Sequence, residues 1–283
     1  MRVVTWNLWW RFGPWQERQP AIARSLVELK PDIVCLQEVW STSADDEGLL
    51  GDERPAAIDQ AEVLANALGG FHVARTEERF RDGVSFGNAI LSRWPIVKSA
   101  SLDLPPIKDG RSHRKALFTA VEAPHGIVPV FCTHLAYRFD ESELRQRQVR
   151  LLLEFIDEHR DKSQNAHPPV LGGDLNAVPT SDEIRLLTGE SATPVEGLVM
   201  TDAWPQRGTG DGVTWTHRNP YSADASWPQR RIDYLMVGWP RPKPLGNVLS
   251  CEVACVESID GVQPSDHYAV VADLHEGFVR AQG

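Results

Sequence analysis

The chain has 283 residues, of which 42% are hydrophobic and 24% are charged, a composition typical of a folded, soluble protein rather than a disordered one. Acidic residues outnumber basic ones by 39 to 29, so the net charge is −10. That sign excludes a protein that coats nucleic acid through a broad basic surface. We therefore expect any polyanionic ligand to be held locally.

The cysteines and the chain start indicate a reduced, cytoplasmic environment. Cys35 and Cys132 lie inside apolar runs, while Cys251 and Cys255 are expected on one face of another strand, so four buried thiols are predicted rather than a disulfide framework. The opening MRVVTWN lacks the pattern of a secretory signal, and no stretch reaches about 18 consecutive apolar residues. We expect a cytoplasmic monomer without membrane insertion.

Short apolar runs, several of them flanked by Pro, Gly or Asp, predict strands. In chain order they cover residues 3–5, 33–36, 89–91, 117–121, 128–133, 170–172, 232–237 and 269–272. Helical periodicity is expected over residues 19–29, 60–68 and 141–158, the last with an apolar stripe of Leu144, Val149, Leu152, Leu153 and Ile156. Strands interleaved with helices predict an α/β protein.

No linker or short repeat divides the chain, so we predict a single domain over residues 1–283. Two polar, turn-rich insertions, residues 41–56 and 207–229, are expected as surface loops near a functional rim or as mobile segments.

Polar residues stand at or beside the predicted strands in a consistent way. These residues are Asn7, Glu38, His134, Asp174, Asn176, Asp233, Asp266 and His267. Ligands of α/β sheets bind beyond the carboxyl ends of strands, so side chains far apart in sequence can converge there. Gly172 and Gly173 are expected to give the backbone before Asp174 room to approach a ligand.

The residue types in this set fit one kind of chemistry. Carboxylate and amide oxygens are the ligands that Mg²⁺ prefers while it keeps waters and meets a substrate phosphate. Two imidazoles suit proton transfer or charge stabilisation at phosphate oxygens. The combination is typical of phosphate-ester hydrolysis.

The segments TWN, LQE, GNAILSR, THL, GDLN, RIDY and SDH, in that order, resemble the signature segments of the endonuclease/exonuclease/phosphatase superfamily. The resemblance runs from residue 5 to about residue 273. It implies a four-layered α/β sandwich, with two packed mixed β-sheets flanked by helices. A single tripeptide would be weak evidence, whereas seven in order are specific.

The resemblance also implies roles for the individual residues. Glu38 would be the principal ligand of Mg²⁺ or a substituting Mn²⁺, with Asn7 and Asp266 close to the metal. Asp174 would position and deprotonate the attacking water, and Asn176 would contact the phosphate. Asp233 would orient His267, which would stabilise the phosphoryl oxygens.

His134 matches the superfamily members that carry a second histidine at the phosphate. Abasic-site endonucleases lack it, which argues against abasic-site repair.

Each residue also has a structural alternative. Asn7 could be a turn residue, Glu38 a solvated strand-end charge, Asp174 and Asn176 an Asx-type turn, and His267 a cap. Asp233 could pair with Arg231 instead of His267, because a buried carboxylate needs a partner.

Other positions are candidates for contact with the substrate. Four residues are expected to contact it: Asn88, Arg114, Tyr137 and Arg138. A basic stretch, residues 108–115, could grip a phosphate or be a solvated loop. Trp9, Trp10, Phe12 and Trp15 could stack on a ligand, although local packing is favoured.

The sequence therefore predicts a divalent-metal-dependent phosphodiesterase or nuclease, with a phosphate ester as substrate and nucleic acid among the candidates. One alternative is a phosphomonoesterase acting on an inositol phosphate or another small ester. A second is a non-catalytic binding module of the same fold, which is disfavoured because every expected metal and water-positioning group is present.

Overall fold

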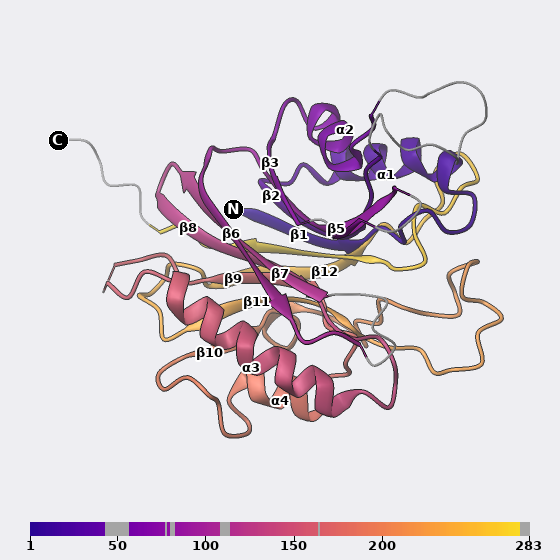
Figure 1. Cartoon of the computed structure of the whole chain (residues 1–283). Coiled ribbons are helices and arrows are strands. Elements are labelled where there is room, and N and C mark those ends of the chain that lie inside the picture. Colours follow the sequence, from indigo (N-terminus) through magenta and orange to yellow (C-terminus); the bar gives the residue numbers. More distant parts are fainter. Residues whose placement is uncertain (43–56, 77, 80–82, 108–113, 164, 278–283) are drawn as a thin grey trace.

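A computed structural model describes residues 1–42, 57–76, 78–79, 83–107, 114–163 and 165–277. Two β-sheets pack face to face, and helices cover their outer faces (Figure 1). The predicted four-layered α/β sandwich is confirmed. Within the described ranges, no helix has the length and apolarity needed to span a membrane.

The first sheet joins the two ends of the chain. Its strands, in order, are β12 (Val248–Ala254), β13 (Ala269–Leu274), β1 (Arg2–Asn7), β2 (Ile33–Val39), β5 (Ser85–Ser92) and β3 (His72–Arg75), with β4 (Glu78–Arg79) also paired to β5. β1 and β2 run parallel, while β13 is antiparallel to β1. Helices α1 (Trp15–Leu29) and α2 (Gln60–Ala67) share a buried apolar cluster with this sheet, including Trp6, Ile22 and Leu64.

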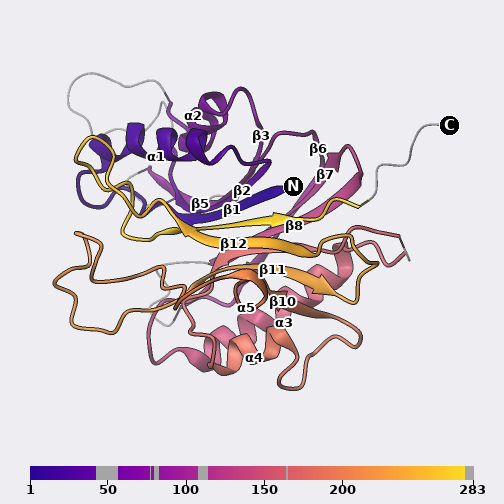
Figure 2. The same cartoon turned by 180° about the vertical axis from the view of Figure 1, so that it is seen from behind.

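The second sheet comes from the middle of the chain. Its strands, in order, are β10 (Val199–Asp202), β11 (Asp233–Trp239), β9 (Val170–Asp174), β8 (Gly126–His134), β7 (Arg114–Ala123) and β6 (Ile96–Leu104). Helices α3 (Ser142–His159) and α4 (Asp182–Thr188) cover its outer face, and the short α5 (Trp204–Arg207) packs against β12 (Figure 2).

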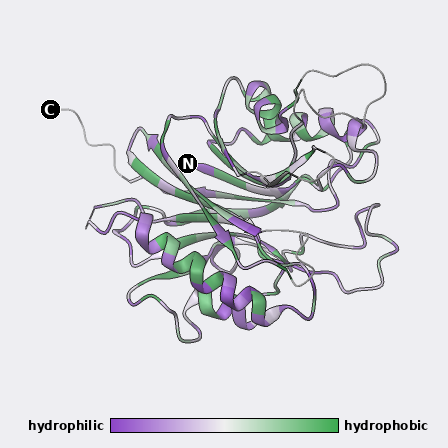
Figure 3. Cartoon of the chain, viewed as in Figure 1, coloured by the Kyte–Doolittle hydropathy of each residue, from purple (hydrophilic) through white to green (hydrophobic). Residues whose placement is uncertain are grey.

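Helix α3 follows the predicted apolar stripe. Val149, Leu152 and Ile156 are buried in one cluster with the second sheet, and hydrophobic and hydrophilic residues alternate along the helix (Figure 3). The core between the sheets is a separate cluster that includes Val3, Ile33 and Leu117.

The cysteine prediction is partly wrong. All four thiols are free, and Cys35, Cys132 and Cys251 are buried, but Cys255 is half-exposed. Cys251 lies between the sheets, whereas Cys255 packs on the helix side of the first sheet. β12 ends at Ala254 and Cys255 has a φ of 59°, so the alternation that would place both on one face is broken.

The expected role of the two glycines before Asp174 is also wrong. An ideal Cβ on Gly172 would lie 2.8 Å from Cβ of Cys35 in the opposite sheet, and one on Gly173 would lie 2.5 Å from the carbonyl oxygen of Thr133 in β8. The space that these glycines leave is taken up by the facing sheet and the neighbouring strand. They let β9 pack closely, and no ligand needs to enter.

Candidate active site

Strand register brings three of the predicted side chains side by side in the second sheet. Asp174 is the Cα partner of Asp233 on β11 and of His134 on β8. Register partners on adjacent strands point to the same face of a sheet. Asp233, Asp174 and His134 therefore lie in a row across β11, β9 and β8, with Asp174 in the middle.

The first sheet contributes Asn7 and Glu38 opposite this row. Asn7 is the last residue of β1 and pairs with Gln37, whose side chain points between the sheets and meets Cys132. In a regular strand Glu38 would point to the opposite face. A break in register between Leu36 and Val39 and a φ of 56° at Glu38 turn its carboxylate toward Asn7 instead. Such backbone outliers concentrate at functional sites.

Asp174 is the centre of the resulting cluster and is only 1% exposed. Its Oδ2 accepts a hydrogen bond of 3.0 Å from Nδ2 of Asn7, and its Oδ1 accepts one of 2.9 Å from the backbone N–H of Asn176. Nε2 of His134 lies 3.5 Å from Oδ2. Burial, followed by the charge of Asp233, raises the pKa of Asp174 to about 6, so this carboxyl is poised to exchange a proton near neutral pH.

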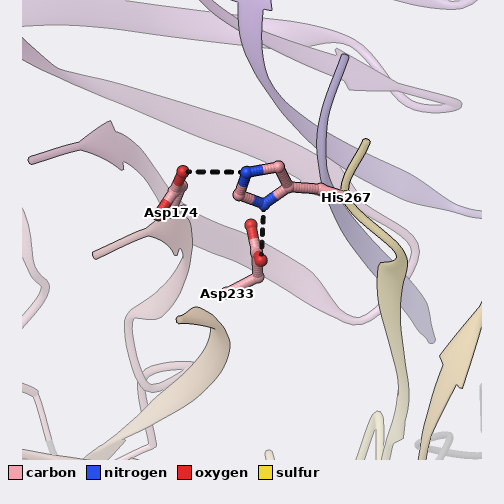
Figure 4. A group of neighbouring side chains, drawn as sticks. All are labelled: Asp174, Asp233 and His267. Carbon is pink, nitrogen blue, oxygen red and sulfur yellow. Dashed lines mark hydrogen bonds and ion pairs between the residues drawn. The ribbon is translucent and has the colours of Figure 1, made fainter. Parts of the chain in front are cut away.

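Asp233 pairs with His267, as Figure 4 shows. Nδ1–H of His267 donates to Oδ2 of Asp233 over 2.9 Å, which leaves Nε2 facing Asp174 at 3.9 Å, an ion-pair distance. The alternative partner, Arg231, binds Asp202 over 2.7 Å. The predicted Asp233–His267 contact is therefore present, and the alternative pairing is wrong.

The protonation of His267 follows from its neighbours. Burial alone would lower its pKa, but the negative charges of Asp233 and Asp266 outweigh burial and raise the pKa well above the ordinary value. His267 is thus a cation at neutral pH, with its Nε2–H directed into the site.

His134 is in the opposite state. Nη1 of Arg114 donates to Nδ1 of His134 over 2.9 Å, and a guanidinium can only donate, so Nδ1 must accept. Burial, together with the charge of Arg114, lowers the pKa of His134 well below the ordinary value. His134 is therefore a neutral imidazole with its proton on Nε2, directed at Asp174.

The residues expected to hold a metal fit a hard cation. Oε2 of Glu38 is buried and, within the described part of the chain, has no hydrogen-bond partner. Burial raises the pKa of Glu38, and burial, with Glu38 among the nearby charges, raises the pKa of Asp266 to about 6. A buried carboxylate oxygen without a hydrogen-bond partner is the kind of ligand that a divalent ion takes.

A second acidic group, Asp174, Asp233 and His267, has ligand atoms within 4.8 Å of one another. The hydrogen bond between His267 and Asp233 already uses one ligand atom of each of these two residues.

Two further residues support the site and carried no sequence signal. Arg18, fully buried in α1, donates to the carbonyl oxygens of Leu8 and Pro264 over 2.8 and 2.9 Å, tying the loop after Asn7 to the loop before Asp266. Thr214 donates to Oδ2 of Asp233 over 2.5 Å. Thr214 belongs to the insertion over residues 207–229, which was expected as a surface loop near a functional rim or as a mobile segment, and which also reaches the buried site.

The candidate substrate contacts fall into two groups. Asn88 and Arg114 are buried and line a small pocket with His134, and Nδ2 of Asn88 donates to the carbonyl oxygen of Lys115. Tyr137 and Arg138 are exposed in the loop after β8, with the guanidinium 5.7 Å from the ring centroid.

The remaining sequence features are placed as follows. Residues 108–113 of the basic stretch and residues 43–56 of the first insertion lie outside the described residues. Lys115 forms an ion pair with Asp103. Trp9 packs on Tyr221 with ring centroids 4.6 Å apart, and Trp15 packs on Trp40, as local packing predicts.

The comparison with known proteins agrees with this fold. The model of the Endonuclease/Exonuclease/phosphatase family matches residues 4–267, and the chain belongs to this family of phosphoester hydrolases. Among curated proteins it is similar to "Protein angel" of Drosophila melanogaster, with 26% identity over 229 residues, 74% of this chain. The match covers 57% of that relative's length.

Solved structures share the fold over nearly the whole chain. An endonuclease/exonuclease/phosphatase from Beutenbergia cavernae is 28% identical, with a TM-score of 0.68 over 97% of this chain and 71% of that chain. The mannosyl-6-phosphatase of Bacteroides thetaiotaomicron is 20% identical, with a TM-score of 0.70 and coverage of 97% and 99%. D. rerio TDP2, complexed with a single-strand DNA product, is 18% identical, with a TM-score of 0.70 and coverage of 96% and 97%.

Replacing Asp233 tests the pairing with His267. In Asp233→Asn the charge that raises the His267 pKa is gone and burial dominates, so His267 loses its proton at a lower pH. We expect the basic limb of the pH–rate profile to shift to lower pH, with turnover at neutral pH reduced about 10²-fold. The NMR titration of the His267 ring in metal-free protein measures the same shift.

Thr214→Val, which removes one donor and leaves the charge, serves as the graded control and should give a smaller effect. A wild-type pH profile in Asp233→Asn would show that the pair has no part in turnover.

Proposed function

We propose that this protein is a divalent-metal-dependent phosphodiesterase in which Asp174 activates the attacking water. The observation that carries this proposal is the position of Asp174. It is a buried carboxyl with a pKa of about 6, and it faces a neutral imidazole and a cationic one. A base between two N–H donors suits the attack of water on a phosphorus whose oxygens gain charge.

Each side chain takes one step in this proposal. Asp174 accepts a proton from the water as the water oxygen bonds to phosphorus. The ester P–O bond breaks, and the leaving oxygen takes the electron pair and then a proton from solvent to give the alcohol. Protonated His267, held by Asp233, stabilises negative charge on the phosphoryl oxygens. Neutral His134 donates a hydrogen bond from Nε2 to the phosphate or to the leaving oxygen. Asn176, fixed by its backbone bond to Asp174, contacts the phosphate.

Glu38 would hold the metal, with Asn7 and Asp266 beside it, and the ion would be Mg²⁺ or Mn²⁺ because these donors are oxygens. When bound, such an ion neutralises charge on the phosphate and polarises its oxygens. The buried carboxylates of Glu38, Asp174 and Asp266 would repel a phosphate, and a bound cation would offset this negative charge.

A diester is the favoured substrate class because only one of the two imidazoles is charged. A diester carries one negative charge and a monoester about two at neutral pH, so a monoester needs more cationic compensation. The second candidate is a phosphomonoesterase, which buried Arg114 favours because its guanidinium lies beside His134. A nucleic acid strand is one diester that fits the proposal.

Removing the metal tests its role. In Glu38→Gln the side chain keeps its shape but loses its charge, so we expect weaker Mn²⁺ binding, measured by calorimetry, and turnover lowered at least about 10²-fold. Glu122→Gln, an exposed position at the far end of β7, should change neither quantity. Full activity after thorough chelation would refute metal dependence.

The substrate class is tested with two chromogenic esters under saturating Mg²⁺ or Mn²⁺. We expect a higher kcat/KM for bis(p-nitrophenyl) phosphate than for p-nitrophenyl phosphate. The opposite preference, lost together with the charge of Arg114 in Arg114→Gln, would identify a phosphomonoesterase.

A further inference from the structure

Two exposed aromatic side chains lie next to each other in the loops around the active site. Phe139 is 54% exposed and Trp227 is 48% exposed, and their ring centroids are 6.0 Å apart with planes inclined at 53°. Phe139 lies in the loop that follows His134 and β8. Trp227 lies in the loop that leads to Asp233 and β11, drawn in orange and extending beyond the sheets in Figure 1.

Arg230 connects this ring pair to the catalytic cluster. Its guanidinium carbon lies 4.6 Å from the Phe139 ring centroid, and its Nη2 donates to the carbonyl oxygen of Asn176 over 2.7 Å. Trp227 is backed by Trp215, with centroids 6.3 Å apart, and the preceding residue, Thr214, binds Asp233. The rings are therefore held by the same loops that build the site.

We propose that Phe139 and Trp227 form a stacking platform for a nucleobase of a single-stranded nucleic acid whose backbone phosphate enters the active site. This inference rests on the proposed function and names its substrate class. Large apolar side chains that are exposed to solvent next to each other indicate a binding surface. Aromatic faces beside an arginine plane are the surface on which unpaired bases stack.

The charge of the chain favours stacking over a long backbone contact. With a net charge of −10, the protein gains little from the release of counterions, which dominates the binding of duplex DNA. Stacking on neutral rings gives affinity without a broad basic groove, and it is open to every base. A short single strand, with unpaired bases next to the phosphate, fits this balance.

A lipid chain fits the same surface less well. Acyl chains need continuous apolar cover, whereas Phe139 stands between the exposed polar residues Arg138 and Asp140 and is stacked on Arg230. The rings are thus set in a polar, partly cationic rim, which suits an aromatic base attached to a phosphate.

The test separates base stacking from backbone binding. The Asp174→Asn protein, whose turnover should be at least about 10²-fold lower, is titrated with a short single-stranded oligonucleotide and with a sugar–phosphate strand of the same length that lacks bases. We expect about tenfold tighter binding of the base-bearing strand, a preference within the range of stacking on one or two rings. Adding Phe139→Ala and Trp227→Ala should abolish this preference, and Phe139→Tyr should keep it.

Trp239→Ala is the matched control, because Trp239 is 55% exposed at the opposite end of the strand that begins with Asp233. It should leave the preference unchanged. An equal affinity of the parent protein for both strands, or a preference that survives loss of both rings, would overturn the platform. If loss of both rings weakened binding to vesicles with choline headgroups but not to either strand, the platform would be overturned in favour of a lipid site.

Hydrolysis of bis(p-nitrophenyl) phosphate, with Asp174 intact, tests the chemistry separately. At saturating substrate, the ring variants should keep a kcat for this small diester within about twofold of wild type, because in this proposal neither ring contacts the phosphorus or the atoms bonded to it. If the wild-type protein cleaved no diester while the base preference held and depended on both rings, the proposed function would fail and the platform would stand.

Discussion

The register between β8, β9 and β11 is the constraint on which the site depends. It sets His134, Asp174 and Asp233 in one row, so a slip of one residue on any of these strands would turn a functional side chain to the other face. Gly172 and Gly173 let β9 lie close enough to the facing sheet and to β8 for the row to meet Asn7 and Glu38. The close packing of β9 is therefore also what brings the side chains of the site together.

Burial of charge is the second constraint, because a buried carboxylate is unfavourable unless it is paired or hydrogen-bonded. Asp233 meets this demand through His267 and Thr214, and Asp174 through Asn7 and its own loop. Glu38 is only partly satisfied, because one of its buried carboxylate oxygens has no hydrogen-bond partner among the described residues. In our proposal a divalent cation binds this oxygen, and the cation and the phosphate enter together.

The sequence predicted the central strands and the convergence of polar residues, because buried strands are apolar runs and their ends are abrupt. It missed β6 and β3, which lie at sheet edges and carry polar, exposed residues such as Lys98 and His72. Arg18 could not be found either, since nothing local distinguishes a buried arginine that binds distant carbonyl groups. The Phe139–Trp227 contact joins loops far apart in the chain, and only tertiary structure brings them together.

Whether Asp174 directs water to phosphorus is measured directly by hydrolysis of a phosphodiester in water enriched in oxygen-18. We expect one labelled oxygen per turnover in the phosphate-containing product and none in the alcohol, with the rate of incorporation falling at least about 10²-fold in Asp174→Asn. Label in the alcohol, or an unchanged rate of incorporation in Asp174→Asn, would contradict it.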